Sequence, residues 1–305
     1  MEKHRKKLIK NAAVFDGHSS GLVQGKKIVI EDDIVTEITA DEVSEENFDE
    51  VFDGTGMVAM PGMTDAHVHM GCLFAKGEFP VDYATVLTVA KCKDALMAGF
   101  TTFRDAGSVS EGLKLAFDEG VLPGPRIYPC GAYISQTCGH GDSEYAHTYR
   151  DIQYRHPSST VLADGVPEII RAVREQFYRG ASHIKLMATE ILNRHEDIRL
   201  LFGTDMMITG PDYQVEQSED IRYYEKRFGT MRALRALTGT ANEVFALTTY
   251  QNPYPKGKIG VLEAGAFADL LLVDGDPTKR VSVLADTDHL RLIMKGGTVY
   301  KNTLC

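Results

Sequence analysis

Two histidines separated by one residue, His67 and His69, constrain this chain more than any other feature of its sequence. They end the run PGMTDAHVH, residues 61–69, in which a Pro-Gly turn precedes a stretch with strand character. Side chains two apart on a β-strand point to the same face of a sheet, so both imidazoles can aim at one point. A catalytic metal needs such an arrangement from its first ligands. Two unrelated histidines also fall at this spacing by chance, so the metal interpretation depends on acidic and lysine positions downstream.

Composition and charge narrow the class of function. The chain has 43 acidic and 33 basic residues and a formal net charge of -10, which argues against nucleic acid or an anionic membrane as partner. Its basic start is not followed by an apolar segment, so we expect no signal peptide, and no apolar run reaches the length of a membrane span. The five cysteines are scattered without CxxC spacing, which is typical of reduced thiols. We therefore expect a cytoplasmic homo-oligomer whose partner is a small-molecule peptide or amide substrate.

The two ends of the chain predict β-strands that belong together. Stretches 8–15, 27–31 and 34–38 are rich in β-branched residues, and 269–273 and 290–300 have the same character, the last broken at Gly296-Gly297. Each end alone is too small for a comfortable hydrophobic core. We therefore expect residues 1–60 and 255–305 to form one composite β-sandwich domain.

The centre of the chain, residues 61–254, alternates predicted strands and helices. Strands are expected at 65–69, 101–104, 126–135, 183–187 and 200–204, and helices at 84–98, at 110–119 and from Pro167 to Gly180. Such alternation indicates a parallel α/β sheet, either open or closed into a barrel. At the end of the second strand we expect Arg104 and Asp105 to form a structural ion pair.

Six segments together resemble the metal-dependent amidohydrolase superfamily. In chain order they are MPGMTDAHVHM, AGFTTFRDAG, SQTCGHGD, HIKLMAT, LLFGTD and NPYPKGKIGVLEAGAFADLLLVDGDP, and they extend over nearly the whole sequence. The most similar branch contains Xaa-Pro dipeptidases and imidazolonepropionase-related enzymes. The resemblance implies a (β/α)8 barrel of the TIM type with a composite β-sandwich. It also implies hydrolysis of an amide bond by a metal-activated water.

The resemblance gives roles to five residues. His67, His69, Lys185 and Asp205 would bind one or two divalent metals, expected to be Zn²⁺, with Lys185 carboxylated by CO2 so that it can bridge them. Apolar neighbours of Lys185 favour burial, which eases the proton loss that carbamate formation requires. Asp205 follows an apolar strand and would also act as general base. His140 lies in a glycine-lined loop and would contact the substrate carbonyl or carboxylate, although a hydrogen-bonded loop histidine fits this position nearly as well.

The chain departs from the family between Lys185 and Asp205, which are separated by only 19 residues. Three βα units of about 30 residues each should lie there, together with two further metal-binding histidines. His195 is the one histidine in this interval, and its charged neighbours indicate a solvated helix end, not a metal ligand. Either the printed sequence omits a segment or three barrel strands are missing; we favour omission, because deletion would expose unpaired strand edges. A chain of just these residues is expected to bind at most one metal.

The sequence therefore predicts a metal-dependent hydrolase that cleaves the amide bond of a dipeptide or an N-acyl amino acid. A cyclic-amide hydrolase of the imidazolonepropionase kind is a second reading of the same motifs. A non-catalytic remnant of the fold, lacking part of the metal site, is a third.

Overall fold

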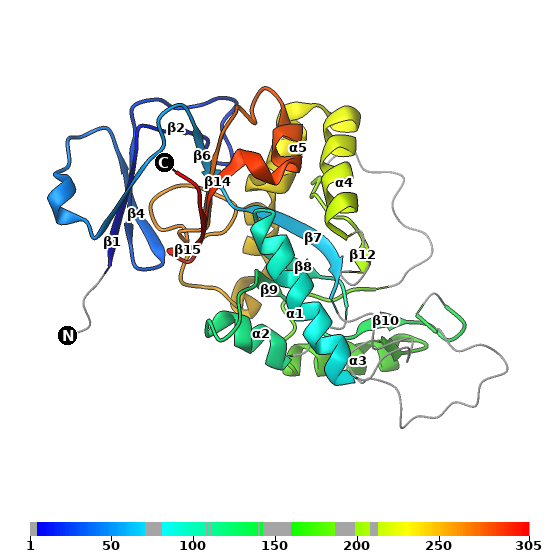
Figure 1. Cartoon of the computed structure of the whole chain (residues 1–305). Coiled ribbons are helices and arrows are strands. Elements are labelled where there is room, and N and C mark those ends of the chain that lie inside the picture. The colour runs from blue at the N-terminus through cyan, green and yellow to red at the C-terminus, as the bar shows by residue number, and fades with distance from the viewer. Residues whose placement is uncertain are drawn as a thin grey trace.

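Strands from both ends of the chain build two sheets in the computed structural model (Figure 1). The structure describes residues 5–70, 81–107, 109, 111–139, 141–142, 160–186, 199–207 and 213–304. One sheet has the order β4-β3-β1-β5 and contains β1 (Lys6–Lys10), β3 (Lys27–Glu31), β4 (Ile34–Thr39) and β5 (Glu50–Asp53). The other has the order β15-β14-β13-β6-β2 and joins β2 (Ala13–Val14) and β6 (Val58–Pro61) to β13 (Leu270–Val273), β14 (Leu290–Lys295) and β15 (Thr298–Asn302).

The central strand β13 is buried on both faces, which explains its unbroken sequence LLLV. Leu270 and Leu272 lie in a core shared with the first sheet, whereas Leu271 and Val273 lie in a second core shared with the helices. The five-stranded sheet is thus a layer between the first sheet and the α/β region. Strands from the two ends contribute to one core; the division into a composite domain of residues 1–60 and 255–305 and a central domain stays a prediction.

Four parallel strands with the order β12-β7-β8-β9 form the core of the α/β region. They are β7 (Met63–His69), β8 (Phe100–Asp105), β9 (Arg126–Tyr128) and β12 (Met206–Met207). A separate parallel pair consists of β10 (Tyr133–Ser135) and β11 (Thr160–Leu162), with an isolated bridge from Ile134 to Leu186. The helices are α1 (Val81–Met97), α2 (Glu111–Asp118), α3 (Val166–Tyr178), α4 (Tyr213–Phe228), α5 (Thr230–Leu237) and α6 (Gly239–Phe245). Short 3-10 helices are η1 (Glu45–Asn47), η4 (Ala246–Gln251), η5 (Val281–Ala285) and η6 (Thr287–His289).

The predicted α/β class is confirmed, but the described strands do not close into a barrel. No pairing within the described part of the chain joins β9 to β10, or β11 to β12. The strand expected over 126–135 is divided into two, and that expected over 183–187 is reduced to the Leu186 bridge, with residue 187 outside the described part. A closed ring needs eight parallel strands. The 19 residues between Lys185 and Asp205 are too few to supply three more βα units.

A buried ion pair fastens the α/β region to the composite sheet. Arg126 of β9 donates from Nε and Nη2 to the two carboxylate oxygens of Asp269, at 2.8 and 3.2 Å, and its guanidinium lies 3.7 Å from the ring centre of Phe267. Such a bidentate contact fixes orientation as well as distance.

None of the helices in the described ranges is long and apolar enough to span a bilayer.

Candidate metal centre

Three of the predicted ligands converge at the carboxyl end of β7. The Nε2 atoms of His67 and His69 lie 3.0 and 3.2 Å from the same Asp205 oxygen, Oδ1. One potential ligand atom from each residue lies within 4.8 Å of the other two. The histidines end β7, and Asp205 immediately precedes β12, the neighbouring parallel strand. Since barrel-type active sites lie at the carboxyl ends of parallel strands, this is the expected edge of the sheet.

The segment before β12 reaches its position through a close backbone approach. Asp205 donates its backbone N–H to the His67 carbonyl at 2.7 Å. At Gly203 any added Cβ would lie 2.7 Å from the Cβ of His67, so only glycine allows the two segments to approach this closely. Asp205 itself has φ +56, a left-handed conformation that aspartate tolerates better than most residues. The carboxylate is therefore held in place by its main chain.

Lys185 reaches the same cluster from a different element. Its Nζ lies 3.0 Å from His67 Nε2, and its carbonyl accepts from the Ile134 N–H of β10. The side chain is only partly buried, and the neighbouring Leu186 is 53% exposed, so the burial expected from the sequence is reached only in part. All four predicted metal ligands thus lie side by side. His140, the predicted substrate contact, lies outside the described residues.

The electrostatics favour a neutral His67. Burial, followed by the positive charge of Lys185, lowers the pKa of His67 to about 4, against the opposing effect of Asp205. The imidazole is therefore neutral at pH 7, which is the form that binds metals. His69 is more deeply buried, and its ring meets Tyr133 edge-on, with the ring centres 6.4 Å apart.

The donor set fits one divalent cation. Two imidazole nitrogens and one carboxylate oxygen are the ligand types that zinc takes in catalytic sites with an open position. Asp205 is 69% exposed and His67 34%, so the open side of the cluster faces solvent. Within the described ranges, this group is the one set of three or more histidine, cysteine or acidic side chains with metal-binding spacing.

A buried carboxylate that the sequence reasoning did not single out holds the cluster together. Asp65 accepts from the N–H of His67, from both the N–H and the hydroxyl of Thr204, and from the side-chain amide of Gln217 on α4. It therefore ties β7 to the residue next to Asp205. Burial raises the pKa of Asp65 to about 7, although these hydrogen bonds oppose the shift. A carboxylate two residues before the first histidine of a buried strand was the signal that could have identified it.

The predicted Arg104–Asp105 ion pair is wrong. Asp105 accepts from the N–H groups of Met70, Gly107 and Val109, and so connects residues that directly follow β7 and β8. Arg104 points to the other face of β8 and donates to the carbonyl of Ala66 at 3.3 Å. Adjacent residues on a strand face opposite sides, so their side chains separate even though they are neighbours in sequence.

Comparison with known proteins supports the resemblance predicted from the motifs. Residues 58–198 match the sequence model of the Amidohydrolase family. This range includes His67, His69 and Lys185 but not Asp205. Ochratoxinase from Aspergillus niger is 34% identical over 152 residues, covering 43% of this chain and 31% of that protein. Imidazolonepropionase from Picrophilus torridus is 39% identical over 176 residues, covering 53% of this chain and 43% of that protein. The chain thus spans less than half the length of either relative.

One solved structure is similar to this chain over nearly its whole length. A prolidase complexed with N-methylphosphonate-L-proline has a TM-score of 0.82 and 22% sequence identity, covering 97% of this chain and all of that one. At this identity the likeness shows the fold alone. The resemblance to the amidohydrolase superfamily that the motifs predicted is confirmed.

Proposed function

We propose that this chain, which resembles the amidohydrolase superfamily, hydrolyses the amide bond of a dipeptide or an N-acyl amino acid with the help of one bound divalent metal, Zn²⁺. The observation that supports this most directly is the convergence of His67, His69 and Asp205 on one point at the end of β7. His140 would contact the substrate carbonyl or carboxylate.

The residues of the cluster would have two roles, metal binding and proton transfer. His67 and His69 would hold the metal through Nε2, and Asp205 through Oδ1, the oxygen that faces both histidines. A metal bound here would supply a Lewis acid and lower the pKa of a bound water to about 7. The second oxygen of Asp205, Oδ2, would take the proton from the attacking water and return it to the leaving amine nitrogen. The exposure of Asp205 leaves room for both partners.

Lys185 would act as a carbamate. As an ammonium it places a positive charge 3.0 Å from a ligand nitrogen of His67, which opposes binding of a cation. If the neutral amine adds to the carbon of CO2 and releases a proton, the group becomes an anionic oxygen donor. The carbamate would therefore turn the same contact from repulsive to attractive for the metal.

Metal analysis combined with turnover assays tests the proposal. The purified full chain, dialysed against Zn²⁺ and bicarbonate, should retain about one zinc per chain and release amino acids from a panel of Xaa-Pro dipeptides and N-acetyl amino acids. Lys185→Ala should lose zinc, and added bicarbonate should not restore it. A Lys185→Ala protein with normal zinc content would contradict the carbamate role.

A second candidate function is hydrolysis of a cyclic amide, which the 39% identity to imidazolonepropionase favours. Turnover confined to the ring-opening of a cyclic amide substrate would favour this candidate over the dipeptidase. A protein that binds no metal and turns over neither class would be a non-catalytic remnant of the fold.

A further inference from the structure

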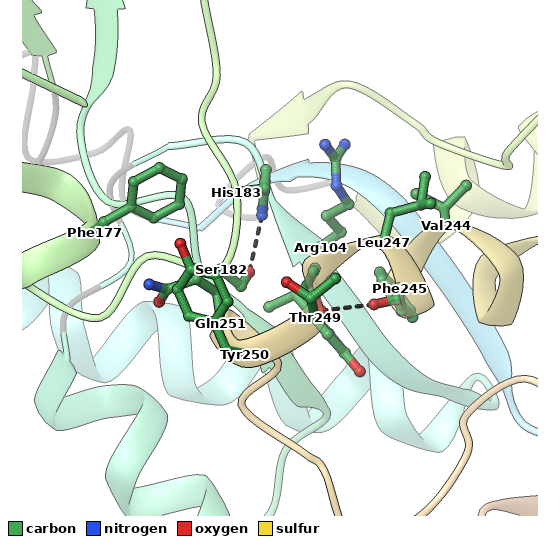
Figure 2. Close-up of a pocket in the computed structure, with 12 residues that line it drawn as sticks. Arg104, Phe177, Ser182, His183, Val244, Phe245, Leu247, Thr249, Tyr250 and Gln251 are labelled. Atoms are coloured by element: carbon green, nitrogen blue, oxygen red, sulfur yellow. Dashed lines mark hydrogen bonds between the residues drawn. The ribbon is translucent and has the colours of Figure 1, made fainter. Parts of the chain in front are cut away.

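A pocket lies between β8, β9, the end of α3 and the segment formed by α6 and η4 (Figure 2). Its volume is about 380 Å³, within the range of small-molecule sites. Arg104 enters from β8, His183 follows α3, and Phe245 and Leu247 line the opposite wall. Figure 2 shows the Arg104 side chain between those of His183 and Leu247. None of the four predicted metal ligands lines this pocket.

Arg104 has no acidic partner among the described residues that line this pocket. The described lining residues include no aspartate or glutamate. In the described part of the chain, the recorded hydrogen bond of Arg104 is the one from Nη1 to the Ala66 carbonyl, and no ion pair joins it to a carboxylate. The side chain is partly buried, and a guanidinium keeps its charge under such conditions. A partly buried cation is costly unless an anion compensates it, so the pocket favours an anionic ligand.

The rest of the wall suits an apolar group. Phe177, Val244, Phe245 and Leu247 contribute apolar surface, and Tyr128 stacks on Phe245 with ring centres 3.8 Å apart and planes 5° from parallel. The Ser182 hydroxyl donates to the Pro129 carbonyl, and its oxygen lies 3.0 Å from Nδ1 of His183. One cation beside an apolar, aromatic wall matches an organic acid with a carboxylate at one end and a small ring or branched chain at the other.

We propose that this pocket binds a small aryl or alkyl monocarboxylate, with the carboxylate on Arg104 and the apolar part against Phe177, Phe245 and Leu247. Because Nη1 is bound to Ala66, the Nε and Nη2 edge offers two parallel donors that match the spacing of a carboxylate. The site requires no metal and goes beyond the proposed hydrolytic activity. It remains if the chain proves catalytically inert.

Titration of metal-free protein with benzoate tests the proposal. The full chain is treated with EDTA, so that a carboxylate cannot bind a metal, and calorimetry measures binding of benzoate and of its neutral counterpart benzamide. A hydrogen bond to a charged group contributes about 1.5–3 kcal/mol, so benzoate should bind at least about tenfold more tightly than benzamide. Arg104→Met should reduce benzoate binding to the benzamide level. Equal binding of the two probes, or none, would overturn the proposal.

A matched pair at Leu247 keeps the test decisive if Arg104→Met fails to fold. Leu247 is 65% exposed, so polar substitutions there are compatible with the fold. Both Leu247→Glu and Leu247→Gln remove an apolar contact, but only Leu247→Glu also places a carboxylate in the wall, so it should weaken benzoate binding about tenfold more than Leu247→Gln does. Equal effects of the two substitutions would contradict the proposal. Lys185→Gln should retain binding; loss in this variant would move the anion to the metal centre and overturn the assignment.

Discussion

The two sheets of the composite region differ from the metal edge, the carboxyl end of β7 with His67, His69 and Asp205, in how regularly their strands pair and how deeply they are buried. Most strand pairs of these two sheets extend over four or five residues, three of them with one register shift, and β13 buries all four of its side chains. At the metal edge, by contrast, β12 has only two residues, and Asp205 is 69% exposed with a left-handed backbone. The first arrangement provides stability and tolerates little change, whereas the second leaves polar groups available for a ligand. Substitutions in the two regions should therefore have separable effects on folding and on chemistry.

The largest effect on chemistry is expected from Asp205→Asn. Loss of a general base typically lowers the rate about 10²- to 10⁴-fold, and because the side chain is exposed the thermal midpoint should change little. Amide turnover and thermal unfolding of the same preparation measure both quantities. Glu243→Gln, at an exposed ion pair with Arg199, serves as the charge-matched control and should retain activity. Equal activity in the two variants would remove Asp205 from the proposed mechanism.

The largest effect on stability is expected at the junction of the two regions. Arg126→Met leaves the buried Asp269 carboxylate without its partner, which should lower the free energy of unfolding by about 3–5 kcal/mol. Arg199→Met breaks the exposed pair with Glu243 and should cost less than about 1 kcal/mol. Urea denaturation of both variants gives the comparison. Similar losses would mean that the junction is no stronger than a surface contact.

Two adjacent leucines on β13 separate the two cores. Leu271 and Leu272 are both fully buried, but Leu271 faces the helices and Leu272 faces the first sheet. Truncation of either to alanine should cost about 2–5 kcal/mol. We expect Leu272→Ala to leave zinc affinity unchanged, since its core does not include β7, whereas Leu271→Ala should weaken it. Equal zinc affinities in the two variants would show that the cores do not differ in their influence on the metal edge.

The last effect concerns Lys295 of β14, which donates to the Gly124 carbonyl, and it is a change of stability with pH. Burial lowers the pKa of Lys295 from 10.5 to about 8, with Asp269 opposing the shift. Between these two values the unfolded chain binds the extra proton, so this residue makes stability rise with pH from about 8 to 10.5. The slope is at most about 1.4 kcal/mol per pH unit. Wild type minus Lys295→Met, measured by urea denaturation, should show this rise; a flat difference would mean that Lys295 keeps an ordinary pKa.

Local sequence patterns predicted several elements, but the segment expected as a strand at 200–204 is irregular, and the strand β12 forms at Met206–Met207 instead. The helices expected at 84–98 and 110–119 form at Val81–Met97 and Glu111–Asp118, because their glycine stops, Gly99 and Gly120, adopt positive φ. The spacing of His67 and His69 placed both rings on one face of β7, since the period of a strand is a property of its backbone. The resemblance then indicated Lys185 and Asp205, which indeed lie beside them.

Tertiary structure alone decided how the distant parts meet. The separation of Arg104 from Asp105 and the clamp that Asp65 forms on Thr204 depend on which strands pair, and β7 pairs with a segment more than 130 residues away. The same holds for ring closure, which depends on how many parallel strands lie between Lys185 and Asp205. Local propensity acts over a few residues and is fixed by the sequence. Long-range pairing depends on the total apolar surface that the strands can bury together, and no single segment contains that information.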